Sequence, residues 1–268
     1  MKNTKIRWTD HTWNPMSGCT HVSPGCDHCY AEAIALSPRF KNAFPAGFTP
    51  TFKTHKLNDP RPWAPGRVFV NSMSDVHHPD FTDGQIDQVV DAMARWDHHD
   101  YLVLTKRPQR MADYWLRRLE RTGAHRVPAN IWLGTSIESD RYTWRADHLR
   151  RIPVDVRFLS CEPLISPLPS LDLAGIGWVI VGGESGNGTK DYRPMDHDWA
   201  RDLRDRTRAA GAAFFFKQSS SHRTEVGIEL DGERIEEFPR VHPLERVGTA
   251  VLDIPERDQW PEMARRPT

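Results

Sequence analysis

The chain has 268 residues with 36 basic and 36 acidic side chains, and this balance provides no overall positive field for nonspecific nucleic-acid binding. The first residues lack an apolar segment of signal-peptide length, and no run of about 18 apolar residues occurs. We therefore expect a cytoplasmic protein. Four cysteines are too few for a disulfide scaffold in a chain of this length.

Seven short apolar runs predict the strands of a parallel sheet. They are rich in Val, Ile, Phe and Trp, which is typical of strands buried on both faces. They cover residues 5–8, 68–70, 101–104, 131–133, 156–159, 178–181 and 213–216.

Helical patterns fill the intervals between these runs. One helix begins near residue 30, and Thr82 is the predicted N-cap of another. Further helices are predicted at 109–121, 141–151 and 197–210. The alternating order predicts a single α/β domain over residues 1–268, an open or complete TIM-barrel-like sheet of βα units. A flat doubly wound sheet is the alternative.

Two regions depart from this alternation. Residues 37–66 are rich in Pro, Phe and Lys, and we expect a surface excursion after the first helix. Residues 219–268 carry charge and proline with little periodicity, which predicts an irregular C-terminal extension.

Polar residues follow each predicted strand where it ends. In parallel α/β folds the βα loops at the carboxyl ends of the strands form the active site. The candidates are Asn71, Asp75, Thr105, Lys106, Arg107, Thr135, Ser136, Glu162, Glu184, Ser185, Lys217 and Gln218. The alternative is that these residues are polar only because strand ends meet water.

Lys217 and Glu162 are the sharpest single candidates for chemistry. Lys217 emerges from an apolar strand, so it is expected to lie near a carboxylate or an anionic ligand. Glu162 ends another strand before a proline. Each is also compatible with a structural ion pair across the barrel mouth.

Gly182 and Gly183 open a turn that continues through Glu184 and Ser185 after a strong strand. Glycines in such a turn let the backbone approach a ligand and present N–H groups to an anion. The turn lacks the spacings of the dinucleotide fingerprint and of the P-loop. It therefore indicates a ligand-facing turn of no particular class.

Three cysteines in a C-x6-C-x2-C pattern, Cys19, Cys26 and Cys29, predict a metal site. Three thiolates leave one iron of a [4Fe–4S] cluster open for chemistry, and Cys29 near the start of a helix suits a negatively charged ligand. Zinc would need a fourth ligand, for which the candidates are His21, His28 and Cys161. Both metals remain possible on spacing alone.

Several stretches resemble one family: TWNPMSGCTHVSPGCDHCYAE, VFVNSMSDVHHP, LTKRP, WLGTSIE, FLSCEPL, VIVGGESG, YRPMD, FFFKQ and LDGERIEEFP. They are similar, in this order, to an uncharacterised, phage-associated family with a domain of unknown function. That family is thought to be related to radical S-adenosylmethionine (SAM) enzymes. The usual triplet of those enzymes is C-x3-C-x2-C, so the C-x2-C half matches here and the first spacer is longer.

The resemblance implies a radical SAM-like barrel in which the three cysteines ligate a [4Fe–4S] cluster and SAM chelates its open iron. Reductive cleavage of SAM would give a 5′-deoxyadenosyl radical that attacks a substrate, with an electron donor such as a flavodoxin or ferredoxin. Lys217, Glu162 and Glu184 would be catalytic. The SAM and substrate pocket would include Tyr30, Asn71, Thr105, Lys106, Thr135, Ser136, Gly182, Gly183 and Ser185.

A nucleotide or nucleic acid is the substrate class that we expect, because of the phage association and of basic residues such as Lys106, Arg107 and Arg110. A zinc-binding protein that recognises or processes nucleic acid without radical chemistry is the alternative. A cluster that only transfers electrons or supports the fold is a third hypothesis.

Overall fold

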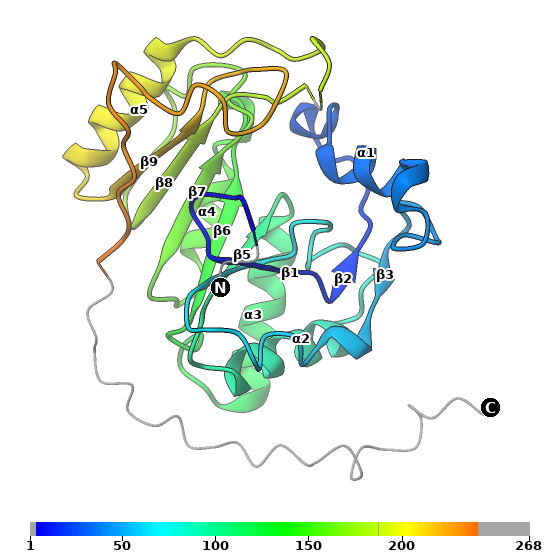
Figure 1. Ribbon diagram of the computed structural model, residues 1–268. Coiled ribbons are helices and arrows are strands. Elements are labelled where there is room, and N and C mark those ends of the chain that lie inside the picture. The colour runs from blue at the N-terminus through cyan, green and yellow to red at the C-terminus, as the bar shows by residue number, and fades with distance from the viewer. Residues whose placement is uncertain (1–3, 187, 241–268) are drawn as a thin grey trace, which may run out of the picture.

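The computed structural model describes residues 4–186 and 188–240. Seven parallel strands form one curled sheet in the order β1-β4-β5-β6-β7-β8-β9, and the sheet is an open half-barrel (Figure 1). Its strands are β1 (His11–Trp13), β4 (Arg67–Val70), β5 (Asp100–Thr105), β6 (Ile131–Ser136), β7 (Arg157–Cys161), β8 (Trp178–Gly182) and β9 (Ala213–Gln218). The predicted parallel α/β architecture is confirmed, with β1 and β9 at the open edges.

The prediction of a first strand at residues 5–8 is wrong, because β1 begins at His11. Residues 6–9 instead form a turn in which the Thr9 N–H donates to the Ile6 carbonyl over 3.4 Å. The Trp8 ring packs into the inner core of the sheet, and Arg7 forms ion pairs with Glu225 and Glu236. The apolar character of Trp8 therefore reflects core packing and not strand pairing.

Helices cover the outer face of the sheet. They are α2 (Asp83–Arg95), α3 (Pro108–Thr122), α4 (Arg145–Arg150) and α5 (His197–Ala209). Thr82 caps α2 as predicted. Its hydroxyl accepts the Gln85 N–H at 3.2 Å, and the Gln85 side-chain oxygen accepts the Thr82 N–H at 2.9 Å. The helix predicted over 141–151 is divided into η4 (Asp140–Tyr142) and α4.

Side-chain alternation along the strands separates two cores. Alternate residues such as Val103, Leu133 and Val181 join the helices in the outer core. The inner core consists of Trp8, Phe69, Leu102, Trp132, Val156, Phe158, Trp178, Ile180 and Phe215. This aromatic layer fills the half-barrel toward the amino ends of its strands. The polar side chains of the inner face lie at the carboxyl ends.

The excursion over 37–66 contains η2 (Pro38–Phe40), η3 (Thr54–Lys56) and β3 (Thr51–Phe52). β3 pairs antiparallel with β2 (Met16–Ser17), which follows β1. Between them, η1 (Pro24–Cys26) and α1 (Tyr30–Leu36) complete the cysteine region. Figure 1 shows α1 on the opposite side of the molecule from α5.

The C-terminal extension is described as far as residue 240. It lies against the edge strand β9, where the Glu237 N–H donates to the Phe214 carbonyl at 3.1 Å and the Phe238 ring meets Trp178 at 5.4 Å between centroids. The remainder of the predicted extension lies outside the described residues. No helix of the described part is long and apolar enough to cross a membrane.

Candidate functional site

The three clustered cysteines lie on one loop between β2 and α1. Cys29 is the N-cap residue of α1, Cys26 ends η1, and all three thiols are free and half-buried. Burial raises the pKa of the Cys29 thiol, and hydrogen bonds from the Glu32 and Ala31 N–H groups oppose that rise. The loop thus presents three thiols within a partly enclosed region.

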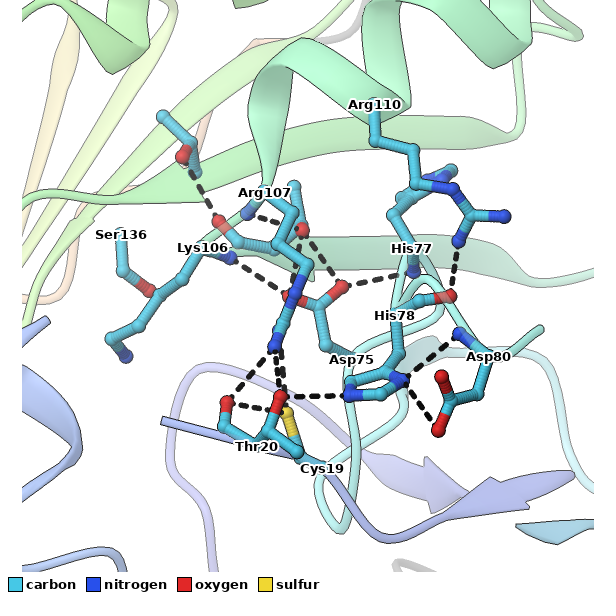
Figure 2. A network of polar contacts seen from close by, with 12 residues as sticks. Cys19, Thr20, Asp75, His77, His78, Asp80, Lys106, Arg107, Arg110 and Ser136 are labelled. Atoms are coloured by element: carbon cyan, nitrogen blue, oxygen red, sulfur yellow. Dashed lines mark hydrogen bonds and ion pairs between the residues drawn. The ribbon is translucent and has the colours of Figure 1, made fainter. Parts of the chain in front are cut away.

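A buried acid and an arginine hold the first part of this loop (Figure 2). The Arg107 guanidinium donates to Cys19 Sγ at 3.3 Å, to the Thr20 carbonyl at 2.9 Å and to Asp75 at 3.1 Å. Asp75 also accepts the Thr105 hydroxyl at 2.7 Å and the His77 N–H at 2.9 Å. The β4 and β5 loops are therefore joined to Cys19 through one ion pair.

The electrostatics of this contact keep Asp75 ionised. Burial opposes its ionisation, but the Arg107 charge and the hydrogen bonds from Thr105 and His77 outweigh burial and lower the pKa of Asp75. Burial, followed by the nearby Asp75 charge, raises the pKa of the Cys19 thiol, and Arg107 opposes both. Arg107 is thus the positive charge that partly offsets the negative charge of Asp75 at Cys19.

A second ion pair holds the later part of the loop. Arg193 binds Glu184 through its side chain and its backbone N–H, the latter at 2.8 Å, and it donates to the Pro24 carbonyl at 2.9 Å. His28 Nδ1 lies 2.9 Å from Glu184 Oε2. Burial would raise the pKa of Glu184, but the Arg193 hydrogen bonds lower it. Glu184, predicted to be catalytic, is thus an ionised anchor of the cysteine loop.

Lys217 and Glu162, the other predicted catalytic residues, form an ion pair on the inner face. Their side chains are 11% and 21% exposed, so both charges lie largely within the protein. Lys217 is on β9 and Glu162 follows β7. The structural ion pair considered from the sequence is therefore present, at the carboxyl end of the sheet.

Three further predicted residues lie around these charges. Tyr30 donates its hydroxyl to the Ser72 carbonyl at 2.6 Å, and burial of that hydroxyl, with Cys29 and Glu162 nearby, raises the pKa of Tyr30. Asn71 is buried, and both of its amide atoms lack a partner among the described residues. Lys106 points away from Asp75, toward Ser136 (Figure 2), and its ammonium makes no ion pair in the described chain.

The unpartnered Asn71 amide and Lys106 ammonium are the strongest indications of ligand binding in this region. A buried amide without hydrogen bonds costs about 1–3 kcal/mol, so native proteins usually satisfy it. Burial raises the pKa of the Cys29 thiol, and the positive Lys106 charge lies near enough to oppose part of that rise. These two groups can receive a polar or anionic molecule beside the cysteine loop.

Other predicted binding residues are engaged within the fold. The Thr105 hydroxyl donates to Asp75, and the Thr135 hydroxyl donates to the Thr105 carbonyl at 2.9 Å. A side chain at Gly183 would meet the Ser220 nitrogen at 2.2 Å, so this glycine permits close approach of two loops. Ser185 forms a parallel bridge with Ser221. These four residues therefore hold the loops around the site together through contacts within the protein.

The fourth cysteine does not share this region. Cys161 is fully buried in the outer core, and burial raises the pKa of its thiol to about 12. Of the other candidates for a fourth zinc ligand, His21 lies 2.7 Å from Glu32, and His28 contacts Glu184. Within the described residues no three His, Cys, Asp or Glu side chains are gathered closely enough to hold a metal ion.

Two surface cavities lie away from the cysteine loop. One, of about 500 Å³, lies between α2 and α3 and includes Asp87 and Arg118. The other, of about 470 Å³, lies at the amino ends of the strands and includes Arg67 and Trp132. Neither includes a predicted site residue.

Sequence reasoning missed the role of Arg193 and the joining of Asp75 and Arg107 to the cysteine loop. Arg193 lies in YRPMD, one of the stretches that carry the family resemblance, but nothing in its spacing indicates a bond to Glu184. Asp75 and Arg107 were visible only as separate polar residues after strands. Contact between loops far apart in the chain depends on the curl of the sheet.

Comparison with known proteins identifies the family without an activity. A family model described as "Protein of unknown function (DUF5131)" matches residues 3–239. Neither the curated proteins nor the solved structures contain a match to the chain. Because the family model spans both ion-paired anchors, the cysteine loop and all seven strands, the chain belongs to the DUF5131 family.

Proposed function

We propose that this protein is an iron–sulfur enzyme of radical SAM type that modifies a nucleotide or nucleic acid. Cys19, Cys26 and Cys29 would hold a [4Fe–4S] cluster. The observation that carries this proposal is the set of three half-buried free thiols on one loop, anchored by Arg107 and Arg193 at the carboxyl end of a parallel half-barrel. The half-barrel is compatible with a radical SAM-like fold, and a phage origin would suit a nucleic-acid substrate.

The donor set fits a cluster in chemical type. Thiolates are the ordinary ligands of iron–sulfur clusters, and the backbone N–H groups at the start of α1 favour negative charge at Cys29. The thiols are not gathered into a three-ligand group in the described chain, so a cluster would have to draw them together as it binds. When bound, it would supply an electron to SAM, replenished by a flavodoxin- or ferredoxin-like donor.

The remaining residues would bind and orient SAM. Asn71 offers an amide without a partner, and Lys106 offers an unpaired positive charge to an anionic group. Tyr30 follows Cys29 directly and its hydroxyl lies near Glu162. The Glu162–Lys217 pair presents both a hydrogen-bond acceptor and donors on the inner face, where it would position SAM or substrate.

Zinc is the second metal considered, and the contacts favour iron over it. His21 and His28 are each engaged with a glutamate, and Cys161 belongs to the outer core. A four-ligand zinc site would have to recruit one of them. Three reduced thiols would also suit a cytoplasmic location.

Anaerobic purification tests the cluster. We expect a brown protein with about four irons per chain. Substituting Cys19, Cys26 and Cys29 by Ser should abolish the iron, whereas Cys161→Ser should retain it. One zinc in a colourless protein would overturn the proposal.

Reductive incubation with SAM tests the reaction class. Chromatography should detect 5′-deoxyadenosine formed by the reduced wild-type protein and none formed by the triple serine variant. A full cluster without SAM cleavage would instead support electron transfer or a structural role.

A further inference from the structure

A strongly basic segment lies beside the cysteine loop. Residues 37–56 contain four basic residues, Arg39, Lys41, Lys53 and Lys56, and no acidic residue, within a chain of formal net charge zero. We call residues 37–56 the basic lobe. Its charge is concentrated locally, so the neutral total does not exclude a local anion-binding surface.

The backbone of the basic lobe is fixed to the cysteine region. The Cys19 N–H donates to the Phe48 carbonyl at 3.1 Å, and the Lys53 N–H donates to the Pro15 carbonyl at 2.7 Å. The Trp13 indole donates to the Lys56 carbonyl at 2.7 Å. These three hydrogen bonds therefore hold the lobe in a defined position beside the cysteine loop.

The four basic side chains of the lobe form no ion pair within the described chain. By contrast, Arg117 and Arg121 on α3 pair with Asp83 and Asp87, each at 2.7 Å. In the lobe, Lys53 Nζ lies 4.8 Å from the Phe44 ring centroid and the Arg39 guanidinium lies 5.5 Å from that of Phe40. Ring contacts of this kind leave the positive charge unneutralised.

Exposed apolar side chains lie next to these charges. Leu36 is 62% exposed and Phe40 38%. Leu36 Cδ2 lies 3.3 Å from the Cβ position of Gly47, which joins the end of α1 to the lobe. Unpaired cations beside exposed rings are the combination that binds single-stranded nucleic acid, because phosphates meet the cations and bases stack on the rings.

We infer that the basic lobe, with Leu36 at its border, is a docking surface for single-stranded nucleic acid. This inference rests on the proposed function and adds to it the place where a polymeric substrate enters. The contact of the Phe48 carbonyl with Cys19 places this surface directly beside the cysteine loop. A nucleic-acid strand bound to the lobe would pass close to the cysteine loop.

Single-stranded nucleic acid fits this surface better than an anionic membrane does. Membrane-surface binding usually uses an amphipathic helix that carries Lys or Arg on its polar face, and α1 carries neither. The helices here are short: α1 has seven residues, and η2 and η3 have three each. The exposed Phe40 ring beside Arg39 favours bases as the second recognition element.

Fluorescence anisotropy with the full chain tests the inference, using fluorescein-labelled DNA and RNA oligonucleotides of about 15 nucleotides. At about 50 mM salt we expect the R39Q/K41Q/K56Q variant to bind more than about tenfold more weakly than wild type. The slope of log affinity against log salt should fall by about 2, since each lost phosphate contact removes roughly 0.7. Phe40→Leu should weaken binding about tenfold through lost stacking.

The matched control is R95Q/R141Q/R223Q, which removes three exposed arginines outside the lobe that also lack an ion pair within the described residues. It should change the affinity less than about threefold. Equal losses in both triple variants, absence of binding at low salt, or tighter binding to phosphatidylserine vesicles or polyglutamate would each overturn the inference. All the substituted side chains of the lobe variant except Lys56 are exposed, and circular dichroism would check folding.

The two proposals fail separately. If 5′-deoxyadenosine forms but no oligonucleotide binds, the docking surface is wrong and the enzyme proposal stands. If oligonucleotides bind through the lobe but no iron is held, the docking surface stands and the cluster is wrong.

Discussion

Lys217 reaches Glu162 across an intervening strand. Lys217 is on β9 and Glu162 follows β7, while β8 lies between these strands in the sheet. Gly182 at the end of β8 makes this possible: a Cβ there would lie 3.4 Å from Glu162 Cγ and 3.5 Å from Lys217 Cβ. A glycine at this position thus leaves room for two charged side chains to meet over the sheet.

We expect Lys217→Met to destabilise the protein by about 1–2 kcal/mol, because the Glu162 carboxylate would be left unpaired in a largely enclosed position. Glu162→Gln should have a similar effect on its partner. The double variant should be less destabilised than the sum of the two single variants. Urea unfolding of the four proteins measures this coupling energy.

Substitutions of different size at Gly182 provide a control for this double-mutant cycle of Lys217 and Glu162. Gly182→Ala should leave the pair intact, since the added methyl group would make only ordinary van der Waals contacts. Gly182→Val should separate the two charges and approach the destabilisation of Lys217→Met. Additive effects of Lys217→Met and Glu162→Gln would show that the ion pair contributes no coupling.

The contact of Arg107 with the cysteine loop predicts a local loss of order on substitution. Arg107→Lys keeps a positive charge but cannot bind Cys19, Thr20 and Asp75 together, since the planar guanidinium provides the several donors. Hydrogen exchange at residues 18–22 should become about tenfold faster, with little change in the outer core.

Arg110→Lys is the matched control for this measurement. Arg110 lies in the first turn of α3, just after the N-cap residue Arg107, but it donates to the carbonyls of His78 and Phe81 and forms no bond to the cysteine loop. Its substitution should leave exchange at residues 18–22 unchanged. Equal acceleration in the two variants would mean that Arg107 has no specific role in holding Cys19.

The other anchor predicts an effect on the later part of the loop. Glu184→Gln would remove the charge that Arg193 binds, and the expected destabilisation is about 1–2 kcal/mol. Exchange should accelerate at residues 24–29, because Arg193 also holds the Pro24 carbonyl. Asp191→Asn is the control, since this carboxylate is 81% exposed and lies 3.8 Å from His28.

The architecture was largely predictable because buried parallel strands have a local signature. Continuous apolar runs located six of the seven strands, and Thr82 located the start of α2. The first strand was mistaken because Trp8 is as apolar as a strand residue but packs from a turn. Short periodic segments do not distinguish these two cases.

The candidate site was predictable in membership but not in roles. Polar residues after the strands identified Glu162, Glu184 and Lys217, since the strand order places them at one edge. The same pattern did not reveal that Arg193 forms an ion pair with Glu184, or that Gly182 leaves room for Lys217 to reach Glu162. These pairings depend on three-dimensional distances between loops, which have no short-range signal.

His77 predicts how stability depends on pH. It is buried against Tyr114, and both ring nitrogens lack a partner among the described residues. Burial lowers its pKa to about 4, with Asp75 and Asp83 opposing the shift and Arg110 adding to it. The unfolded chain binds the proton at an ordinary pKa near 6.5, so acid favours unfolding.

Stability from His77 is therefore complete above about pH 6.5 and is lost as the pH falls toward 4, by about 3 kcal/mol in total. His77→Phe keeps a ring of similar shape without a titrating group. Between pH 7 and 4.5 this variant should lose less stability than wild type, measured by urea unfolding at each pH. His125→Phe, at an exposed histidine, should follow the wild-type profile. Parallel profiles for wild type and His77→Phe would show that His77 is protonated equally in both states, which its burial without partners argues against.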